Sequence, residues 1–157
     1  MERTDDGLDG SRYRLEPSGD GGATTVVASG AEPQAVLVAG LRGVLVLAAG
    51  KTAVGAGSEA TLAAPLEAQG TDLAETFAGL ADALLAQVDV FGAGLEDVRL
   101  DGLLETDTGG YSAWGYAVGR ERGGSLPRAV ELAGPVSVSV SADEHGRIEL
   151  RCPLRPL

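Results

Sequence analysis

The apolar residues of the chain first indicate a helix that opens at Ala31-Glu32-Pro33. Pro33 suits the first helical position, and Glu32 lies near the positive end of the helix dipole. The following residues leave almost no polar face, which predicts a helix packed between other elements: Val36, Leu37, Val38, Leu41, Val44, Leu45 and Leu47. A buried pair of strands is the rival interpretation, but the length and the lack of strict alternation favour a helix.

A second helix has a clearer polar face. Asp72 and Glu75 stand at capping-box spacing, with Thr71 as an alternative cap. Apolar residues then recur at helical intervals on one face: Leu73, Phe77, Leu80, Leu84, Leu85, Val88 and Phe91. Gly92 and Gly94 end the pattern.

The remaining apolar segments have the character of strands. They cover Tyr13–Glu16, Ala23–Ser29, a short edge strand at Ala60–Leu62 leading to Leu66–Ala68, Val98–Leu104, Tyr111–Arg120, Arg128–Ala133, Pro135–Ala142 and Arg147–Leu154. The last two alternate apolar and polar residues around a turn at Asp143–Gly146, which predicts a hairpin.

This order of elements predicts an α+β fold, in which two helices pack on one face of a mixed or mainly antiparallel sheet. Residues 1–10 have no periodic apolar pattern, and we expect a disordered acidic tail there. Residues 11–157 are then a single domain with one substantial core.

Charge narrows the classes of partner. The net charge is −11, from 23 acidic and 12 basic side chains. Such a field repels phosphate backbones, so we expect no direct nucleic-acid binding. An acidic protein that works on RNA would act through a basic partner or a bound cation.

Two further features of the sequence indicate the cellular compartment and whether the chain crosses a membrane. Cys152 is the single cysteine and cannot form an internal disulfide, and the charged first residues do not form a secretory signal. The most apolar run, Ala35–Gly50, is interrupted by Arg42 and is shorter than the roughly 20 residues that cross a bilayer. We therefore expect a cytoplasmic protein that is not inserted in a membrane.

The segment from Arg12 to Gly22 carries the most informative chemistry. A strand-like run breaks at Ser18 into a glycine-rich turn around one carboxylate, Asp20. Asp20 has a purely structural interpretation as an Asx-type turn residue. Glu16, two residues before Ser18, is more simply a solvated side chain of the strand.

The order Leu15-Glu16-x-Ser18-Gly19-Asp20-x-Gly22 resembles the archease signature Leu-Glu-His-Thr-Ala-Asp-x-Gly. The resemblance implies an archease-like α+β fold and a non-catalytic accessory factor of the RNA ligase that joins 3′-phosphate or cyclic-phosphate ends to 5′-hydroxyl ends. Archeases assist this ligase in tRNA splicing and RNA repair by helping it to take up guanylate and turn over. The expected partner is therefore the ligase protein.

The same resemblance implies a divalent cation, Ca²⁺ or Mg²⁺, held by Asp20 and Glu16. Both ions prefer several oxygen ligands, and carbonyl groups of the turn would add to the two carboxylates. The sequence departs from the family at Pro17, where the signature has histidine. It departs again near Arg151–Leu154, where the family's second metal-binding aspartate is expected and the sequence is Arg-Cys-Pro-Leu.

Other candidates have simpler structural interpretations. Asp143, Glu144 and His145 suggest a hydrolase, but their place at a hairpin tip favours an exposed turn. Cys152 alternates with Leu150 and is expected to be buried. Trp114 and Tyr116 fit packing better than base stacking.

A protein-binding module without metal or ligase activity is the alternative function. The glycine-rich strand at 111–119 offers an edge for docking or for self-association into a homo-oligomer.

Overall fold

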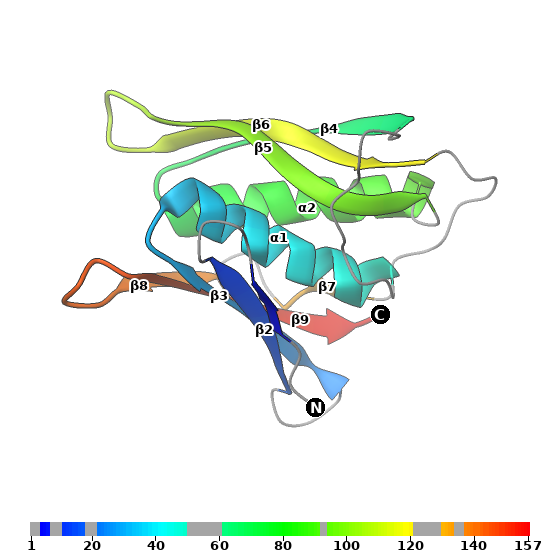
Figure 1. Cartoon of the computed structure of the whole chain (residues 1–157), viewed down its shortest axis with the longest axis horizontal. Coiled ribbons are helices and arrows are strands. Elements are labelled where there is room, and N and C mark those ends of the chain that lie inside the picture. The colour runs from blue at the N-terminus through cyan, green and yellow to red at the C-terminus, as the bar shows by residue number, and fades with distance from the viewer. Residues whose placement is uncertain are drawn as a thin grey trace.

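Two antiparallel sheets enclose a pair of helices in the computed structural model, which describes residues 4–6, 11–17, 22–49, 61–91, 94–120, 130–133 and 137–157 (Figure 1). The helices are α1, Pro33–Ala49, and α2, Leu73–Phe91. The larger sheet contains β1 (Thr4–Asp6), β2 (Arg12–Pro17), β3 (Thr24–Gly30), β7 (Val130–Leu132), β8 (Ser139–Ala142) and β9 (Ile148–Pro156). The smaller sheet contains β4 (Leu62–Gly70), β5 (Leu95–Glu105) and β6 (Tyr111–Gly119).

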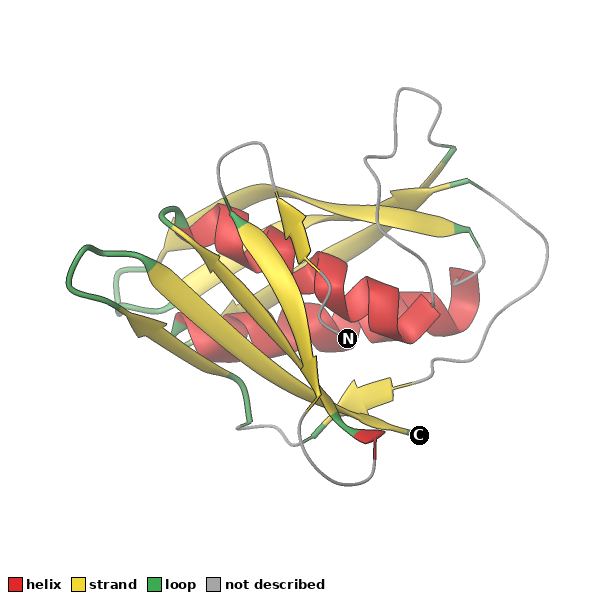
Figure 2. Cartoon of the chain, turned by 60° about the horizontal axis from the view of Figure 1, so that its bottom comes forward, coloured by secondary structure: helices red, strands yellow, loops and turns green. Residues whose placement is uncertain are grey.

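The larger sheet has the order β1-β2-β3-β9-β7, and β8 pairs with the first half of β9 (Figure 2). Tyr13 and Leu15 of β2 point into the core, because they alternate with half-buried or exposed residues. Arg12, Arg14 and Glu16 therefore lie on the outer face of this sheet. That face is turned toward the viewer in Figure 2.

The smaller sheet has β6 at its centre and β4 and β5 at its edges. Ala113 and Ala117 of β6 are buried toward the helices, while Trp114 between them is exposed on the outer face. The register of β5 against β6 shifts twice, between Leu95 and Asp97 and between Leu100 and Gly102.

Helix α1 is buried on nearly all sides, as its sequence predicts. It packs against β3, α2 and β5, and its apolar residues join a core cluster that spans both sheets. Two glycines make this close packing feasible. A Cβ at Gly40 would lie 2.7 Å from Cε1 of Phe77, and one at Gly43 would lie 2.6 Å from Cγ1 of Val26.

Helix α2 has the predicted cap, and its predicted apolar face is buried except at the two ends, where Leu73 is half-buried and Phe91 is exposed. The Asp72 carboxylate accepts a hydrogen bond from the backbone N–H of Glu75 at 2.8 Å, and the Thr71 hydroxyl bonds the Glu75 carboxylate. The face that contacts α1 and β4 is fully buried: Phe77, Leu80, Leu84, Leu85 and Val88.

The expectation of a single sheet is wrong, although the α+β class is confirmed. The strands divide into two sheets, one on each side of the helix pair, and all pairings between strands are antiparallel in the part of the chain that is described. The physical reason is that α1, which is apolar all round, must be covered on two sides.

Three local predictions also differ from the structure. Thr4–Asp6 pairs with β2 as an added edge strand, whereas the whole of 1–10 was expected to be disordered. β4 runs unbroken through Pro65, which an edge strand tolerates. The predicted strand at 135–142 is regular only from Ser139. Residues 1–3, 7–10, 60, 128–129 and 135–136 lie outside the described residues.

No helix among the described residues is long and apolar enough to cross a membrane.

Candidate functional site

The predicted signature lies in the connection between β2 and β3. Pro17 pairs with Thr24, so residues 18–23 join the two strands at one end of the larger sheet. Asp20 lies outside the described residues. Gly22, which follows it, has a φ of 76°, and a Cβ there would lie 3.6 Å from Cγ of Pro156. The end of β9 is thus beside the end of this connection.

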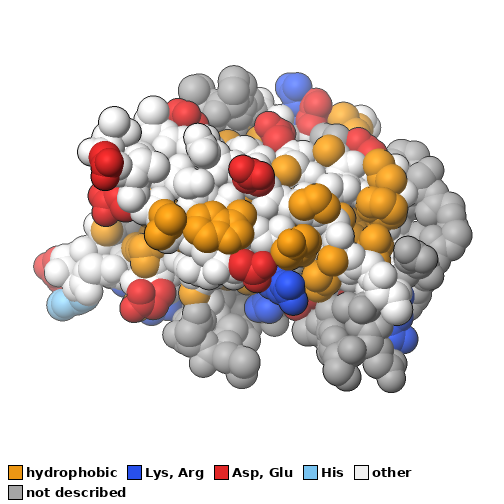
Figure 3. Space-filling view, turned by 90° about the horizontal axis from the view of Figure 1, so that it is seen from above, with side chains coloured by type: hydrophobic (Ala, Val, Ile, Leu, Met, Phe, Trp, Pro, Cys, Tyr) orange, Lys and Arg blue, Asp and Glu red, His pale blue; other side chains and the backbone are white. Residues whose placement is uncertain are grey.

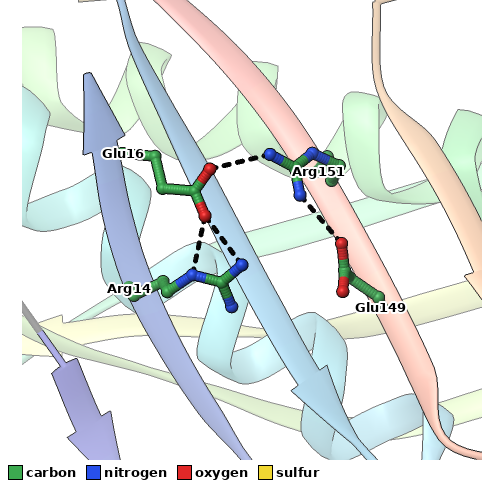
Figure 4. A network of polar contacts seen from close by, with 4 residues as sticks. All are labelled: Arg14, Glu16, Glu149 and Arg151. Atoms are coloured by element: carbon green, nitrogen blue, oxygen red, sulfur yellow. Dashed lines mark hydrogen bonds and ion pairs between the residues drawn. The ribbon is translucent and has the colours of Figure 1, made fainter. Parts of the chain in front are cut away.

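Glu16 belongs to a chain of four charged side chains on the outer face of the larger sheet (Figure 4). Its Oε2 accepts a hydrogen bond from Nε of Arg14 at 2.7 Å, and its Oε1 accepts one from Arg151 at 2.8 Å. Arg151 also donates to Glu149 at 2.8 Å. Arg14 and Arg151 flank Val27 of β3 in register, and Val27 is fully buried although it faces outward.

These contacts alter the acidity of the network. The hydrogen bond from Arg14 is the largest cause that lowers the pKa of Glu16, and Arg151 adds to it against the opposing effect of burial. The hydrogen bond to Glu149 is the largest cause that raises the pKa of Arg151. The Glu16 carboxylate is therefore ionised at neutral pH, and guanidinium groups already neutralise it.

This arrangement of Glu16 does not fit a divalent cation. Both of its oxygens are taken by guanidinium N–H groups, whereas Ca²⁺ and Mg²⁺ need several free oxygen ligands. Arg151 lies where the family resemblance leads one to expect a second acid. Within the described ranges, no group of three or more His, Cys, Asp or Glu residues could hold a metal. The cation site at Asp20 stays a prediction.

The acidic turn between β8 and β9 is exposed, in agreement with its structural interpretation. The Asp143 carboxylate accepts hydrogen bonds from the backbone N–H groups of His145 and Arg147, both at 2.9 Å. The side chains of Glu144 and His145 are more than four-fifths exposed. Asp143 thus stabilises its own turn, and the predicted location of these residues at a hairpin tip is confirmed.

Cys152 is buried under the helices, as predicted. It is the free cysteine of β9, and burial raises the pKa of its thiol to about 12, with a smaller contribution from Asp82. A thiol in this state is not a nucleophile at neutral pH.

The outer face of the smaller sheet carries an exposed apolar band (Figure 3). Trp114 is 38% exposed and Leu104 is 60% exposed. The indole lies across Gly102, where a Cβ would collide with it. Arg99 stands 5.2 Å from the centre of the Tyr116 ring. Trp114 and Tyr116 therefore pack on their own sheet and keep one side accessible.

The structure also has a hollow lined by Arg12, Arg14 and Arg147, which the sequence analysis did not predict. The available signal was the pair Arg12 and Arg14 on one face of a strand, and Arg147 directly before another strand. Their convergence depends on which strands are neighbours, which the sequence pattern does not define.

Comparison with known proteins shows the fold. No protein-family model and no curated protein matches the chain. The solution structure of Methanobacterium thermoautotrophicum protein 1598 is similar, with a TM-score of 0.58 and 18% identity. The match covers 90% of this chain and 97% of the other. The two proteins therefore share an α+β fold over nearly the whole of their length.

Proposed function

We propose that the protein is a non-catalytic accessory factor of an RNA ligase in tRNA splicing or RNA repair, related to archease. One observation carries the proposal: Leu15 and Glu16 lie near the end of β2 and Gly22 lies just before β3, with Asp20 between them in the sequence, and Gly22 is beside Pro156 at the end of β9. The match to a solved α+β structure over nearly the whole chain supports it at the level of the fold alone.

The charge of the molecule agrees with an indirect action on RNA. A ligase that handles RNA needs basic surface, and a net charge of −11 favours its encounter with an acidic factor. In this proposal the connection around Asp20 contacts the ligase, and the Arg14–Glu16–Arg151–Glu149 network stabilises the strands on each side of it.

A bound Ca²⁺ or Mg²⁺ at Asp20 is a separate part of the proposal. The contacts of Glu16 with two guanidinium groups do not support it as a ligand, so Asp20 would need other oxygen donors.

The alternative function is a protein-binding module of archease-like fold without metal or ligase activity. The observation that favours it is the exposed apolar band around Trp114 and Leu104, on the smaller sheet, which lies across the helix pair from the larger sheet that contains β2. Substitution of Trp114 separates the two functions, because the accessory role assigned to the β2–β3 connection does not require it.

The test is ligase guanylylation over several turnovers, measured with the ligase alone and after addition of this protein. We expect stimulation by the wild type and at least a tenfold loss of it in Asp20→Ala. Asp107→Ala is the matched control, since Asp107 is an exposed acid in the β5–β6 turn. Circular dichroism confirms that each variant is folded. Stimulation that Asp20→Ala loses and Trp114→Ala retains supports the accessory role, whereas no stimulation by folded wild-type protein favours the alternative.

A further inference from the structure

A shallow hollow lies on the outer face of the larger sheet, at the end nearest the β8–β9 turn. Its volume is about 290 Å³, and its lining includes the arginines Arg12, Arg14 and Arg147 and the serines Ser29 and Ser141. The register places Ser29 opposite Arg12 on one side and opposite Glu149 on the other, while Ser141 is opposite Glu149. Four neighbouring strands, β2, β3, β9 and β8, thus contribute to one concave surface.

The charge of this hollow is opposite to that of the protein. Three guanidinium groups line it together with two carboxylates, in a chain whose net charge is −11. Both carboxylates already accept hydrogen bonds: Asp143 from two backbone N–H groups, and Glu149 from the guanidinium group of Arg151. Among the described residues, no carboxylate forms an ion pair with Arg12 or Arg147. Arg14 is already paired with Glu16, so the guanidinium N–H groups of Arg12 and Arg147 are the donors that the hollow offers to a ligand.

The donors present have the chemistry that recognises phosphate. A guanidinium group offers parallel N–H donors that match two oxygens of a phosphate, and hydroxyl groups supply further hydrogen bonds. The hollow lies at the small end of the range for ligand sites, and no aromatic side chain lines it within the described part of the chain. It therefore suits a small polar ligand better than a nucleobase.

We propose that this hollow binds the phosphate group of a small phosphate monoester. Arg12 and Arg147 bind the phosphate oxygens, Arg14 lies beside them while paired with Glu16, and the hydroxyls of Ser29 and Ser141 orient the ligand. This binding is independent of the proposed role at the β2–β3 connection, so either proposal can fail without the other.

The test is calorimetric titration of the full chain with glycerol 3-phosphate and with inorganic phosphate, at constant ionic strength in chloride. We expect saturable binding of glycerol 3-phosphate that weakens as salt rises, because the attraction is electrostatic. Arg147→Gln should weaken it about tenfold, the effect of losing one charge-assisted hydrogen bond. Arg99→Gln is the matched control, since it makes the same charge change on the outer face of the other sheet.

The outcomes distinguish a phosphate monoester from inorganic phosphate as the ligand, and they locate the binding site. Tighter binding of glycerol 3-phosphate than of inorganic phosphate supports the monoester, and equal or weaker binding contradicts it. Changes in amide chemical shifts confined to β2, the β8–β9 hairpin and Ser29 support the location. No saturable binding, or the same loss in Arg99→Gln as in Arg147→Gln, overturns the proposal.

Discussion

At the scale of single residues, arginine side chains form the ion pairs that connect separate elements of this acidic chain. Arg42 interrupts the apolar face of α1, and its guanidinium forms a two-pronged contact with Asp97 of β5, at 2.8 and 3.3 Å. The Asp97 side chain is 8% exposed and that of Arg42 is 25% exposed. Water therefore screens this pair less than the pairs on the surface, and the contact fixes α1 against the smaller sheet.

Substitution of Asp97 tests this link. Asp97→Asn removes the charge that the Arg42 guanidinium contacts at 2.8 Å, and we expect the free energy of unfolding in urea to fall by about 1–3 kcal/mol. Asp101→Asn is the matched control, because Asp101 pairs with Arg99 at 3.4 Å on an exposed face. Its effect should stay below about 0.5 kcal/mol. Equal effects of the two variants would contradict a structural role for the buried pair.

The buried thiol gives a second prediction at this scale. The thiolate is the reactive form, and burial keeps the pKa of Cys152 near 12. We expect iodoacetamide at about pH 8 to label the native protein at least tenfold more slowly than the unfolded protein. The raised pKa also sets the pH dependence of stability: the contribution of the neutral buried thiol is fully present below the usual pKa of a thiol, and it is lost as pH rises from there through about 12. Labelling of native protein at the unfolded rate would contradict it.

The burial or exposure of a side chain was predictable where it follows from the neighbouring residues in the sequence. The alternation Ile148, Leu150, Cys152 predicted the burial of the cysteine, and the exposed turn at 143–146 was predicted from its composition. The partner of Arg42 was not predictable, since Asp97 is 55 positions away in sequence. Arg151 was missed as a partner of Glu16 for the same reason, because it reaches Glu16 across β3 from a distant strand, whereas Arg14 is only two positions away in sequence.

At the scale of elements, the all-apolar sequence of α1 predicted a helix covered on more than one side. It did not define what covers it, because the period of a strand tells which face is buried and not which sheet the strand joins. The division into two sheets therefore became evident only in the structure. The glycines at 40 and 43 have a packing role that the sequence pattern left unexplained.

Gly43→Ala tests the close contact of α1 with β3. An added Cβ would lie 2.6 Å from Cγ1 of Val26 and 3.1 Å from Cδ2 of Tyr13. We expect overpacking to cost roughly 1–3 kcal/mol, which exceeds the gain of about 1 kcal/mol in helix propensity. Val26→Ala provides room, so the double variant should be more stable than the sum of the single effects predicts. Strict additivity in denaturant unfolding would argue against the contact.

At the scale of the whole molecule, two surfaces of the described residues depend on strand order and on the side of each sheet that faces away from the helices. The outer face of the larger sheet carries the arginine hollow, and the outer face of the smaller sheet carries an exposed apolar band. The signature-like residues form a local motif that the sequence shows directly, and their role at the β2–β3 connection stays a prediction.

Thermal unfolding with Ca²⁺, Mg²⁺ or chelator tests the cation. If Asp20 holds an ion, a tenfold excess over the dissociation constant stabilises the native state by about 1.4 kcal/mol, or roughly 3–6 °C in midpoint. We expect Asp20→Ala to abolish the shift and Glu16→Gln to leave it unchanged, because arginines already occupy the Glu16 carboxylate. An absent shift in the wild type would favour the metal-free module.

The most direct measurement is the rate of ligase guanylylation per turnover with wild-type protein and with Asp20→Ala. We expect the wild type to raise the multiple-turnover rate and Asp20→Ala to lose that effect, while the exposed Asp107→Ala retains it. An unchanged ligase rate in the presence of folded wild-type protein would contradict the accessory role. Equal stimulation by wild type and Asp20→Ala would contradict the assignment to the β2–β3 connection.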